Sequence, residues 1–300
     1  MNLSLPPPRP NKHRGQHFLI DKNVVNKMVA LADLHPNETV LEIGPGRGCL
    51  TGSLCQDAAH VLALEVDTAL VQYLNTRFKD RKNLEVRETD AMEFSYRSLP
   101  SKTVIVANLP YYIASPLLFR FFEARDSVDR MVLMLQLEVA QRMVAAPGTK
   151  KYGILSVLTQ YFTKPRLSFK VSRSCFRPSP DVTSAVVHLD LGSNPYQVKE
   201  EAEWMVKTVR AAFSHRRKTL FNSFRTIGLS PSLITQALHG AQIHGGRRAE
   251  TLTLQEFKDL ASAWQQLGVS PSRVIPLSGS STVPLSGSGK TRIRLSHDLV

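Results

Sequence analysis

The sequence has few cysteines and lacks a long hydrophobic run. Its three cysteines, Cys49, Cys55 and Cys175, show no paired spacing and no histidine cluster beside them, so we expect free thiols and no metal site. No apolar run reaches the roughly 18 residues that a membrane span requires, and the first ten residues lack the apolar stretch of a secretory signal. We therefore expect a cytoplasmic protein with no membrane partner.

Acidic residues are also scarce relative to basic ones. The 300 residues include 38 Lys and Arg against 25 Asp and Glu, which gives a formal net charge of +13. A surplus of this size favours a polyanionic partner, and nucleic acid is the first candidate. The alternative is that the charge serves solubility alone.

Segments that read as strands alternate with helical segments over most of the chain. Helices are expected from Asp21 or Asn23, over 68–79 and over 152–162. Strands are expected at 39–44, 60–67, 83–91, 103–108, 129–138, 166–171 and 183–190. This alternation indicates right-handed crossovers, so we predict an α/β fold with a doubly wound, mainly parallel sheet.

The two ends of the chain differ in composition from the middle. Residues 1–14 are rich in proline and contain Arg9, Lys12 and Arg14 without an acid, which predicts a flexible basic arm. Residues 269–300 are rich in Ser, Pro and Gly, which predicts a disordered tail.

A break in the strand pattern near 191–197 marks a domain boundary. We therefore expect a first domain over 1–190 and a smaller, all-helical domain over 191–268, with three or four short helices. The last helix is expected near Thr253, where Glu256 completes the spacing of a capping box.

A glycine-rich stretch, LEIGPGRGCLT at 41–51, lies between the first predicted strand of the sheet and a helix. Gly44, Gly46 and Gly48 permit a tight turn and let a ligand approach bare backbone, and the following helix N-terminus favours a polar or anionic group. The spacing is G-x-G-x-G rather than that of dinucleotide-binding proteins. Alone this is weak evidence, because glycine turns are common without any ligand.

Acidic and amide residues follow the neighbouring strands. Glu42 lies inside the first strand, and Glu65 ends the second, where a ribose-binding acid is expected. Asp90 follows the third strand and is placed to accept from an adenine amino group. Four successive strand ends thus carry Gly44, Glu65, Asp90 and Asn108, an arrangement that suits S-adenosylmethionine as cofactor.

The stretch VIVANLPYYIASP at 104–116 leaves a predicted strand on Asn108. The Asn108 side-chain oxygen and a backbone carbonyl at Leu109 or Pro110 would accept from the amine of an adenine and hold it in line with a methyl group. Tyr111 would stack on the extruded base. The plainer interpretation is a turn with tyrosines covering a surface.

NLPYYI at 108–113 resembles the N-L/I-P-Y signature of the ribosomal RNA adenine N6,N6-dimethyltransferases. Four further segments resemble blocks of that family, in the same order: GQHFL at 15–19, LEIGPGRGCLT at 41–51, CFRPSPDVTSAVV at 175–187 and FSHRRKTLFNSF at 213–224. The resemblance covers roughly 12–268. It implies a Rossmann-like methyltransferase domain over 1–190 and a helical RNA-binding domain over 191–268.

The resemblance also implies roles for individual residues. The cofactor would contact His17, Leu19, Gly44, Glu65, Asp90 and Asn108. The catalytic set would be Asn108, Leu109, Pro110, Tyr111 and Phe176, with the adenine sandwiched between Tyr111 and Phe176. His17 departs from the asparagine that the family often has, although both side chains form hydrogen bonds. Alternatively, Phe176 and Tyr112 belong to the hydrophobic core.

A one-sided run of basic residues lies in the helical part. From Trp204 to Ala249 the chain has eight Lys and Arg and no Asp or Glu. Arg216, Arg217 and Lys218 stand at a predicted helix start, where cations are unfavourable unless phosphate neutralises them. We therefore predict that these three bind RNA, rather than forming a plain solvated face.

The function that the resemblance implies is dimethylation of the N6 amines of two adjacent adenosines in a hairpin loop near the 3′ end of small-subunit (16S) rRNA. The enzyme would be a monomer that takes part in small-subunit biogenesis. Three alternatives remain open: the sister family that dimethylates large-subunit rRNA, a non-catalytic ribosome-assembly factor, and a DNA adenine methyltransferase. The FSHRRKTLFNSF block argues against the first, the intact stretch from Asn108 to Tyr111 against the second, and the missing second proline of the usual DNA-enzyme motif against the third.

Overall fold

The computed structural model describes residues 6–11, 15–192, 199–215 and 217–269. Four predicted features fall wholly or partly outside the described residues: the basic arm at 1–5 and 12–14, the domain boundary at 193–197, Arg216, and the tail beyond residue 269. The flexibility of the arm, the disorder of the tail and the role of Arg216 stay predictions.

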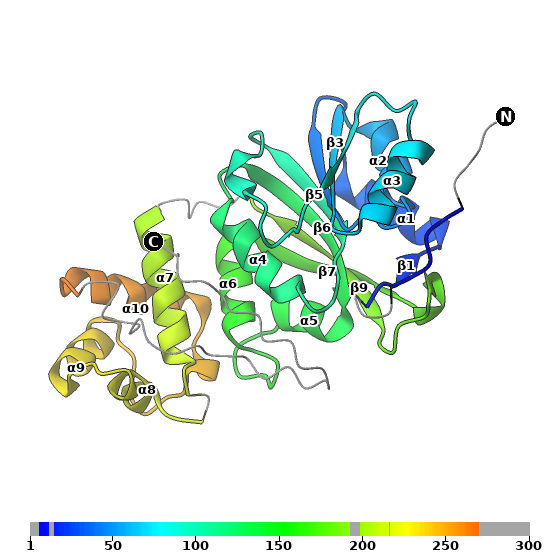
Figure 1. The fold of residues 1–300 in the computed structure, drawn as a ribbon. Coiled ribbons are helices and arrows are strands. Elements are labelled where there is room, and N and C mark those ends of the chain that lie inside the picture. The colour runs from blue at the N-terminus through cyan, green and yellow to red at the C-terminus, as the bar shows by residue number, and fades with distance from the viewer. Residues whose placement is uncertain (1–5, 12–14, 193–198, 216, 270–300) are drawn as a thin grey trace.

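A seven-stranded sheet forms the centre of the protein (Figure 1). Its order is β4-β3-β2-β5-β6-β9-β7, with β2 at Thr39–Ile43, β3 at His60–Glu65, β4 at Leu84–Glu88, β5 at Thr103–Asn108, β6 at Val128–Gln136, β7 at Lys164–Val171 and β9 at Ser184–Asp190. Strands β2 to β6 pair in parallel, whereas β9 pairs antiparallel with both β6 and β7. The predicted doubly wound α/β sheet is confirmed.

Helices cover both faces of this sheet (Figure 1). They are α1 (Lys22–Ala32), α2 (Thr51–Asp57), α3 (Thr68–Arg77), α4 (Ala114–Glu123), α5 (Leu137–Met143) and α6 (Ile154–Phe162). Side chains alternate across a strand, so Val40 of β2 packs in a cluster with α1 and α2, while the next residue, Leu41, packs in a cluster with α4 and α6. Burial on both faces explains why these strands read as apolar runs.

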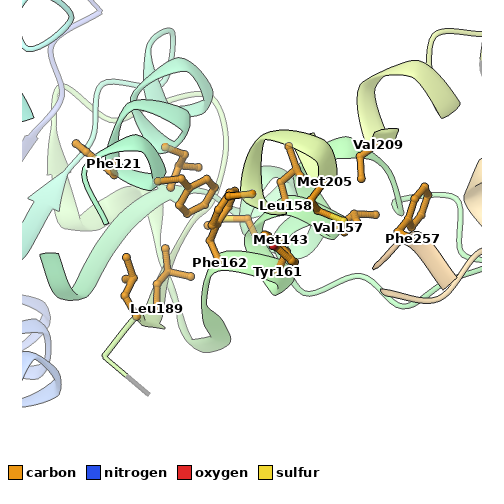
Figure 2. Packing of buried hydrophobic residues seen from close by; sticks show 14 of the residues in the cluster. Phe121, Met143, Val157, Leu158, Tyr161, Phe162, Leu189, Met205, Val209 and Phe257 are labelled. Atoms are coloured by element: carbon orange, nitrogen blue, oxygen red, sulfur yellow. The ribbon is translucent and has the colours of Figure 1, made fainter. Parts of the chain in front are cut away.

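Four helices follow the sheet in the described part of the chain. They are α7 (Lys199–Ala212), α8 (Leu220–Thr226), α9 (Pro231–Gly240) and α10 (Leu254–Gln266). Their hydrophobic core continues that of α6, and Figure 2 shows Leu158 and Phe162 of α6 near Met205 of α7. The Tyr152 hydroxyl also donates to the Leu252 carbonyl at 2.9 Å. Because one core runs through both parts, the division into two domains stays a prediction.

Side chains cap the helices where the sequence predicted that helices begin. Asp21 is the N-cap of α1 and accepts from the backbone N–H groups of Asn23 and Val24. Thr253 and Glu256 form a reciprocal capping box at the start of α10, as predicted.

Short elements complete the fold. They are β1 (Phe18–Leu19), β8 (Phe176–Arg177) and the 3₁₀ helices η2 (Tyr96–Ser98), η3 (Arg173–Cys175) and η4 (Ala249–Thr251). The sequence did not predict β1 and β8, which pair with each other. Within the described ranges, no helix is both long enough and apolar enough to cross a membrane.

Candidate active site

A cavity opens where β2, β3 and β5 end. Parallel strands bring their carboxyl ends to one edge, and the order of the strands in the sheet reverses between β2 and β5, which is where α/β sheets bind ligands. Most predicted site residues line this cavity: His17, Leu19, Gly44, Glu65, Asn108, Leu109, Pro110, Tyr111 and Phe176. Residues far apart in the sequence thus meet in one site.

The glycine loop forms one wall of the cavity. Gly44 has φ +64°, and a β-carbon there would lie 3.9 Å from Pro110 and 4.0 Å from the Asn108 carbonyl oxygen. Gly46 has φ +58°, and its β-carbon would lie 2.8 Å from the Phe18 ring. The loop therefore needs glycine both for its left-handed backbone and for the close approach of Phe18.

We expect Gly46→Ala to weaken the binding of S-adenosylmethionine about tenfold or more, which corresponds to about 1.4 kcal/mol. The new methyl group would push Phe18 away from the loop, in addition to the cost of a left-handed alanine. Gly268→Ala is the matched control, because Gly268 has φ +64° and open space around its β-carbon position. Calorimetry on both variants checks this, and equal affinities would contradict it.

Glu65 holds the loop from the neighbouring strand. Its carboxylate accepts from the backbone N–H groups of Gly46 at 3.2 Å, Val66 at 3.0 Å and Asp67 at 3.1 Å. Burial raises the pKa of Glu65, while these three hydrogen bonds oppose that effect. The predicted contact with a ribose stays a prediction, and the structure adds that Glu65 shapes the glycine loop.

Glu42 is a buried acid that lines the same cavity. Only 2% of the residue is exposed, and its Oε2 atom has no hydrogen-bond partner among the described residues. Burial raises the pKa of Glu42 to about 8, and the nearby Glu65 carboxylate adds to the shift. A cation bound in the cavity would offset this desolvation.

We expect Glu42→Gln to change the pH dependence of stability in the unliganded protein. The pKa of about 8 in the folded state lies above the ordinary value of 4.5, so Glu42 favours unfolding increasingly as the pH rises from 4.5 to 8. The free energy of unfolding of Glu42→Gln, relative to the unaltered protein, should therefore rise by about 3 kcal/mol between pH 5 and pH 8. Urea denaturation at both pH values measures this, and an unchanged difference would contradict it.

Asn108 ends β5 beside the N-terminal segment. Its Nδ2 atom donates to the His17 carbonyl oxygen at 3.5 Å, a long hydrogen bond. That contact orients the amide and leaves Oδ1 as an acceptor. The structure therefore brings His17 and Asn108 together, as the resemblance implied.

The next two backbone carbonyls differ in their hydrogen bonding. The Pro110 carbonyl accepts from the Ile113 N–H at 3.2 Å, while the Leu109 N–H donates to the Met134 carbonyl at 3.0 Å. No donor contacts the Leu109 carbonyl within the described residues. Of the two predicted backbone acceptors, Leu109 is therefore the one with its carbonyl oxygen available.

The pairing of β1 with β8, which the sequence did not predict, forms one side of the cavity. Leu19 lies opposite Phe176 in this antiparallel pair, and the His17 ring Nδ1 donates to the Pro178 carbonyl at 2.9 Å. The two segments GQHFL and CFRPSP therefore lie side by side. Nothing in either segment alone signals a two-residue strand with so distant a partner.

The aromatic residues of the site differ in exposure. Tyr111 is half-buried and lies with its ring 6.2 Å from that of His17, at an interplanar angle of 26°. Phe176 is 1% exposed and packs in the core while lining the cavity, so a base reaches its ring only after neighbouring side chains move. Tyr112 is 51% exposed, which excludes the core role considered for it.

Asp90 is the one predicted cofactor residue that does not line the cavity. It follows β4, at the edge of the sheet, and its Oδ1 atom accepts from the Met92 N–H at 2.7 Å. The contact of Asp90 with adenine stays a prediction.

Arg47 is a cavity residue that the sequence reasoning missed. Its guanidinium donates to the Pro8 carbonyl, with Nη2 at 2.7 Å, and lies 4.6 Å from the centre of the Phe18 ring. Arg47 thus fastens the N-terminal segment to the glycine loop. The sequence gives no signal for these contacts, because Pro8 and Phe18 are far from Arg47 along the chain.

Arg217 and Lys218, the two predicted RNA-binding residues that the structure describes, lie away from this cavity, in the turn before α8. Arg217 and Lys218 are exposed, and Lys218 Nζ donates to Thr226 Oγ1 at 3.0 Å. Among the cations of the basic run that the structure describes, two form ion pairs: Lys207 pairs with Glu203 at 2.6 Å, and Arg247 pairs with Glu256. Unlike Arg217 and Lys218, these two are partly neutralised within the fold.

Across the ranges that the model describes, no group of three or more His, Cys, Asp or Glu side chains is arranged to hold a metal ion.

Comparison with known proteins gives consistent matches over most of the chain. The family model for ribosomal RNA adenine dimethylase matches residues 9–266. The protein named ribosomal RNA small subunit methyltransferase A in Moorella thermoacetica is 40% identical over 267 residues, covering 85% of this chain and 93% of that protein. Its namesake in Pelotomaculum thermopropionicum is 42% identical, covering 86% of this chain and 92% of that protein.

Two solved structures are also similar. A dimethyladenosine transferase from Plasmodium falciparum matches with a TM-score of 0.74 and 28% identity, covering 84% of this chain and 98% of that one. The 23S rRNA methyltransferase ErmE matches with a TM-score of 0.65 and 26% identity, covering 83% of this chain and 100% of that one.

Proposed function

Because this chain belongs to the ribosomal RNA adenine dimethylase family, we propose that it dimethylates the N6 amines of two adjacent adenosines in small-subunit (16S) rRNA, in a hairpin loop near the 3′ end. The methyl donor is S-adenosylmethionine. The observation that carries the proposal is the position of Asn108, which ends β5 at the cavity beside the glycine loop and has its Oδ1 atom available.

The residues of the cavity suit S-adenosylmethionine. The glycine loop leaves room for a ligand against bare backbone, and the buried Glu42 offers a carboxylate oxygen with no partner among the described residues. Such an acceptor suits the positive charge of the cofactor's amino group. When bound, S-adenosylmethionine supplies a methyl group on a positively charged sulfur.

Two acceptors next to the cofactor would hold the target amine. Asn108 Oδ1 and the Leu109 carbonyl oxygen would each accept one N–H of the adenine amine. Two acceptors favour a pyramidal nitrogen, whose lone pair then points toward the methyl group. This is catalysis by positioning and electrostatics, and it needs no strong general base.

Stacking would hold the extruded base in the site. Tyr111 lines the cavity, and Phe176 would form the other side of the sandwich once the base enters. Contact with His17, Leu19, Gly44, Glu65 and Asp90 would hold the cofactor. Arg216, Arg217 and Lys218 would bind RNA phosphates.

Small-subunit rRNA is favoured as the substrate over large-subunit rRNA. The relatives named for the small subunit are 40% and 42% identical to this chain, whereas the 23S rRNA enzyme is 26% identical. We further propose that the protein acts as a monomer in the cytoplasm during small-subunit biogenesis.

The proposal is tested by incubating the purified protein and labelled S-adenosylmethionine with small ribosomal subunits that lack adenine dimethylation. Large subunits and duplex DNA serve as control substrates. Label in the small subunits alone supports the proposal. Label in large subunits or DNA would identify a different substrate. Binding to small subunits without any methyl transfer would indicate an assembly factor.

A further inference from the structure

On the basis of the proposed function, we infer that Ser184 is a positioning residue, which fixes the ring of Tyr111 at the base-binding side of the cavity. Ser184 does not line the cavity itself, although it belongs to the segment CFRPSPDVTSAVV at 175–187 that resembles a block of the family. The inference comes from the topology of the sheet and from one hydrogen bond.

The antiparallel direction of β9 brings Ser184 to the ligand-binding edge. Ser184 is the first residue of β9, and it lies opposite Gln136, the last residue of β6, on one side and Val171, the last residue of β7, on the other. A strand parallel to β6 would instead place its last residue at this edge. The start of β9 thus lies at the same edge of the sheet as the carboxyl ends of β5 and β6.

Tyr111 reaches Ser184 from the other side of β6. Tyr111 follows β5, and its hydroxyl lies 2.6 Å from Ser184 Oγ, a short distance for a hydrogen bond between hydroxyls. Ser184 is fully buried, so water does not replace this partner easily. Burial raises the pKa of the Tyr111 hydroxyl above its ordinary value, so the bond joins two neutral hydroxyl groups, either of which can donate.

The two contacts of Tyr111 restrict different rotations of its side chain. The hydroxyl lies on the axis about which the ring turns, so the bond to Ser184 fixes the direction of the side chain but leaves the ring free to rotate. The stacked His17 ring, at 6.2 Å and 26°, limits that rotation. Together they give the Tyr111 ring one orientation in the wall of the cavity.

Ser184 has no means of acting directly on the substrate. Its Oγ atom has Tyr111 as its only side-chain partner among the described residues, and no histidine or carboxylate contacts it as a base would. Its effect on methyl transfer must therefore pass through Tyr111.

We expect Ser184→Ala to lower kcat for methyl transfer about tenfold, because a loosened base misplaces the amine relative to the methyl group. The affinity for S-adenosylmethionine should stay unchanged. Tyr111→Phe removes the same hydrogen bond from the other side and should lower kcat by a similar factor. The double variant should lose no more than either single variant, since both changes remove one interaction.

Ser156→Ala is the matched control. Ser156 is also fully buried, and its Oγ donates to the Arg142 carbonyl at 2.6 Å, but it lies in α6 and outside the cavity. Its loss should lower the melting temperature and leave kcat unchanged, which separates positioning from general destabilisation.

The double-mutant cycle decides the matter. Losses that multiply in the double variant, or an unchanged kcat in Ser184→Ala, would overturn the positioning role while the proposed function stands. An unaltered protein that transfers no methyl group would overturn the proposed function, and the positioning role with it. The positioning role is supported if kcat of the double variant is no lower than that of either single variant and kcat of Ser156→Ala is unchanged.

Discussion

Replacing Asn108 by alanine is expected to lower kcat for methyl transfer by about 10²–10³-fold, the usual cost of removing one preorganised electrostatic contact to a reacting group. The variant loses the Oδ1 acceptor for the adenine amine and also the Nδ2 bond to the His17 carbonyl. Leu109 would remain as the single acceptor, and the amine would no longer be held in line with the methyl group. Single-turnover kinetics on saturating rRNA substrate measures this loss.

Asn37→Ala is the control for this substitution. Asn37 is exposed and precedes β2, so it lies toward the amino ends of the parallel strands, the edge opposite the cavity. Its replacement should leave kcat unchanged. Full activity in Asn108→Ala would contradict the role given to Asn108, and equal losses in both variants would show that the effect is not specific to the site.

The second large effect is expected from the basic turn before α8. Replacing Arg216, Arg217 and Lys218 together by alanine should weaken the binding of small-subunit rRNA about 10- to 100-fold at physiological salt. Each phosphate contact contributes roughly 0.7–0.9 to the slope of log K against log salt, so the slope should become shallower by about 2–3. Filter binding over a salt series measures both quantities.

A second basic cluster provides the matched control for this triple variant. Lys79, Arg81 and Lys82 are likewise exposed and closely spaced, but they lie after α3, in the sheet part of the chain. Removing them lowers the net charge by the same amount and should leave the salt slope nearly unchanged. Equal effects of the two triple variants would indicate that only total charge matters and would contradict a specific phosphate site.

Strands β2 to β6 and the glycine loop could be predicted because their signals are local. The apolar run at 39–43 and the glycines that follow it are neighbours in the sequence, and Asn108 ends another such run. Placing these ends together needs only the rule that parallel strands share one carboxyl edge. This is why most predicted cofactor residues line the cavity.

The rest depends on contacts between distant parts of the chain. No local pattern pairs Phe18 with Arg177, links Arg47 to Pro8, or brings the Tyr111 hydroxyl to Ser184. Asp90 is a different case, because its bond is local. Its position after β4 could be predicted, but the bond from the Met92 N–H to its carboxylate was not. The same limit applies to charge, because the pairing of Arg247 with Glu256 depends on how the loop before η4 folds back on the start of α10.

The most direct test of the central claim is to identify the methylated nucleoside and count it. Small subunits lacking adenine dimethylation are treated to completion with the protein and S-adenosylmethionine, and their rRNA is digested to nucleosides for mass spectrometry. Our account predicts two N6,N6-dimethyladenosines per small-subunit rRNA, and none with Asn108→Ala. Methylation of another nucleoside, or no new methylation with the unaltered protein, would contradict it.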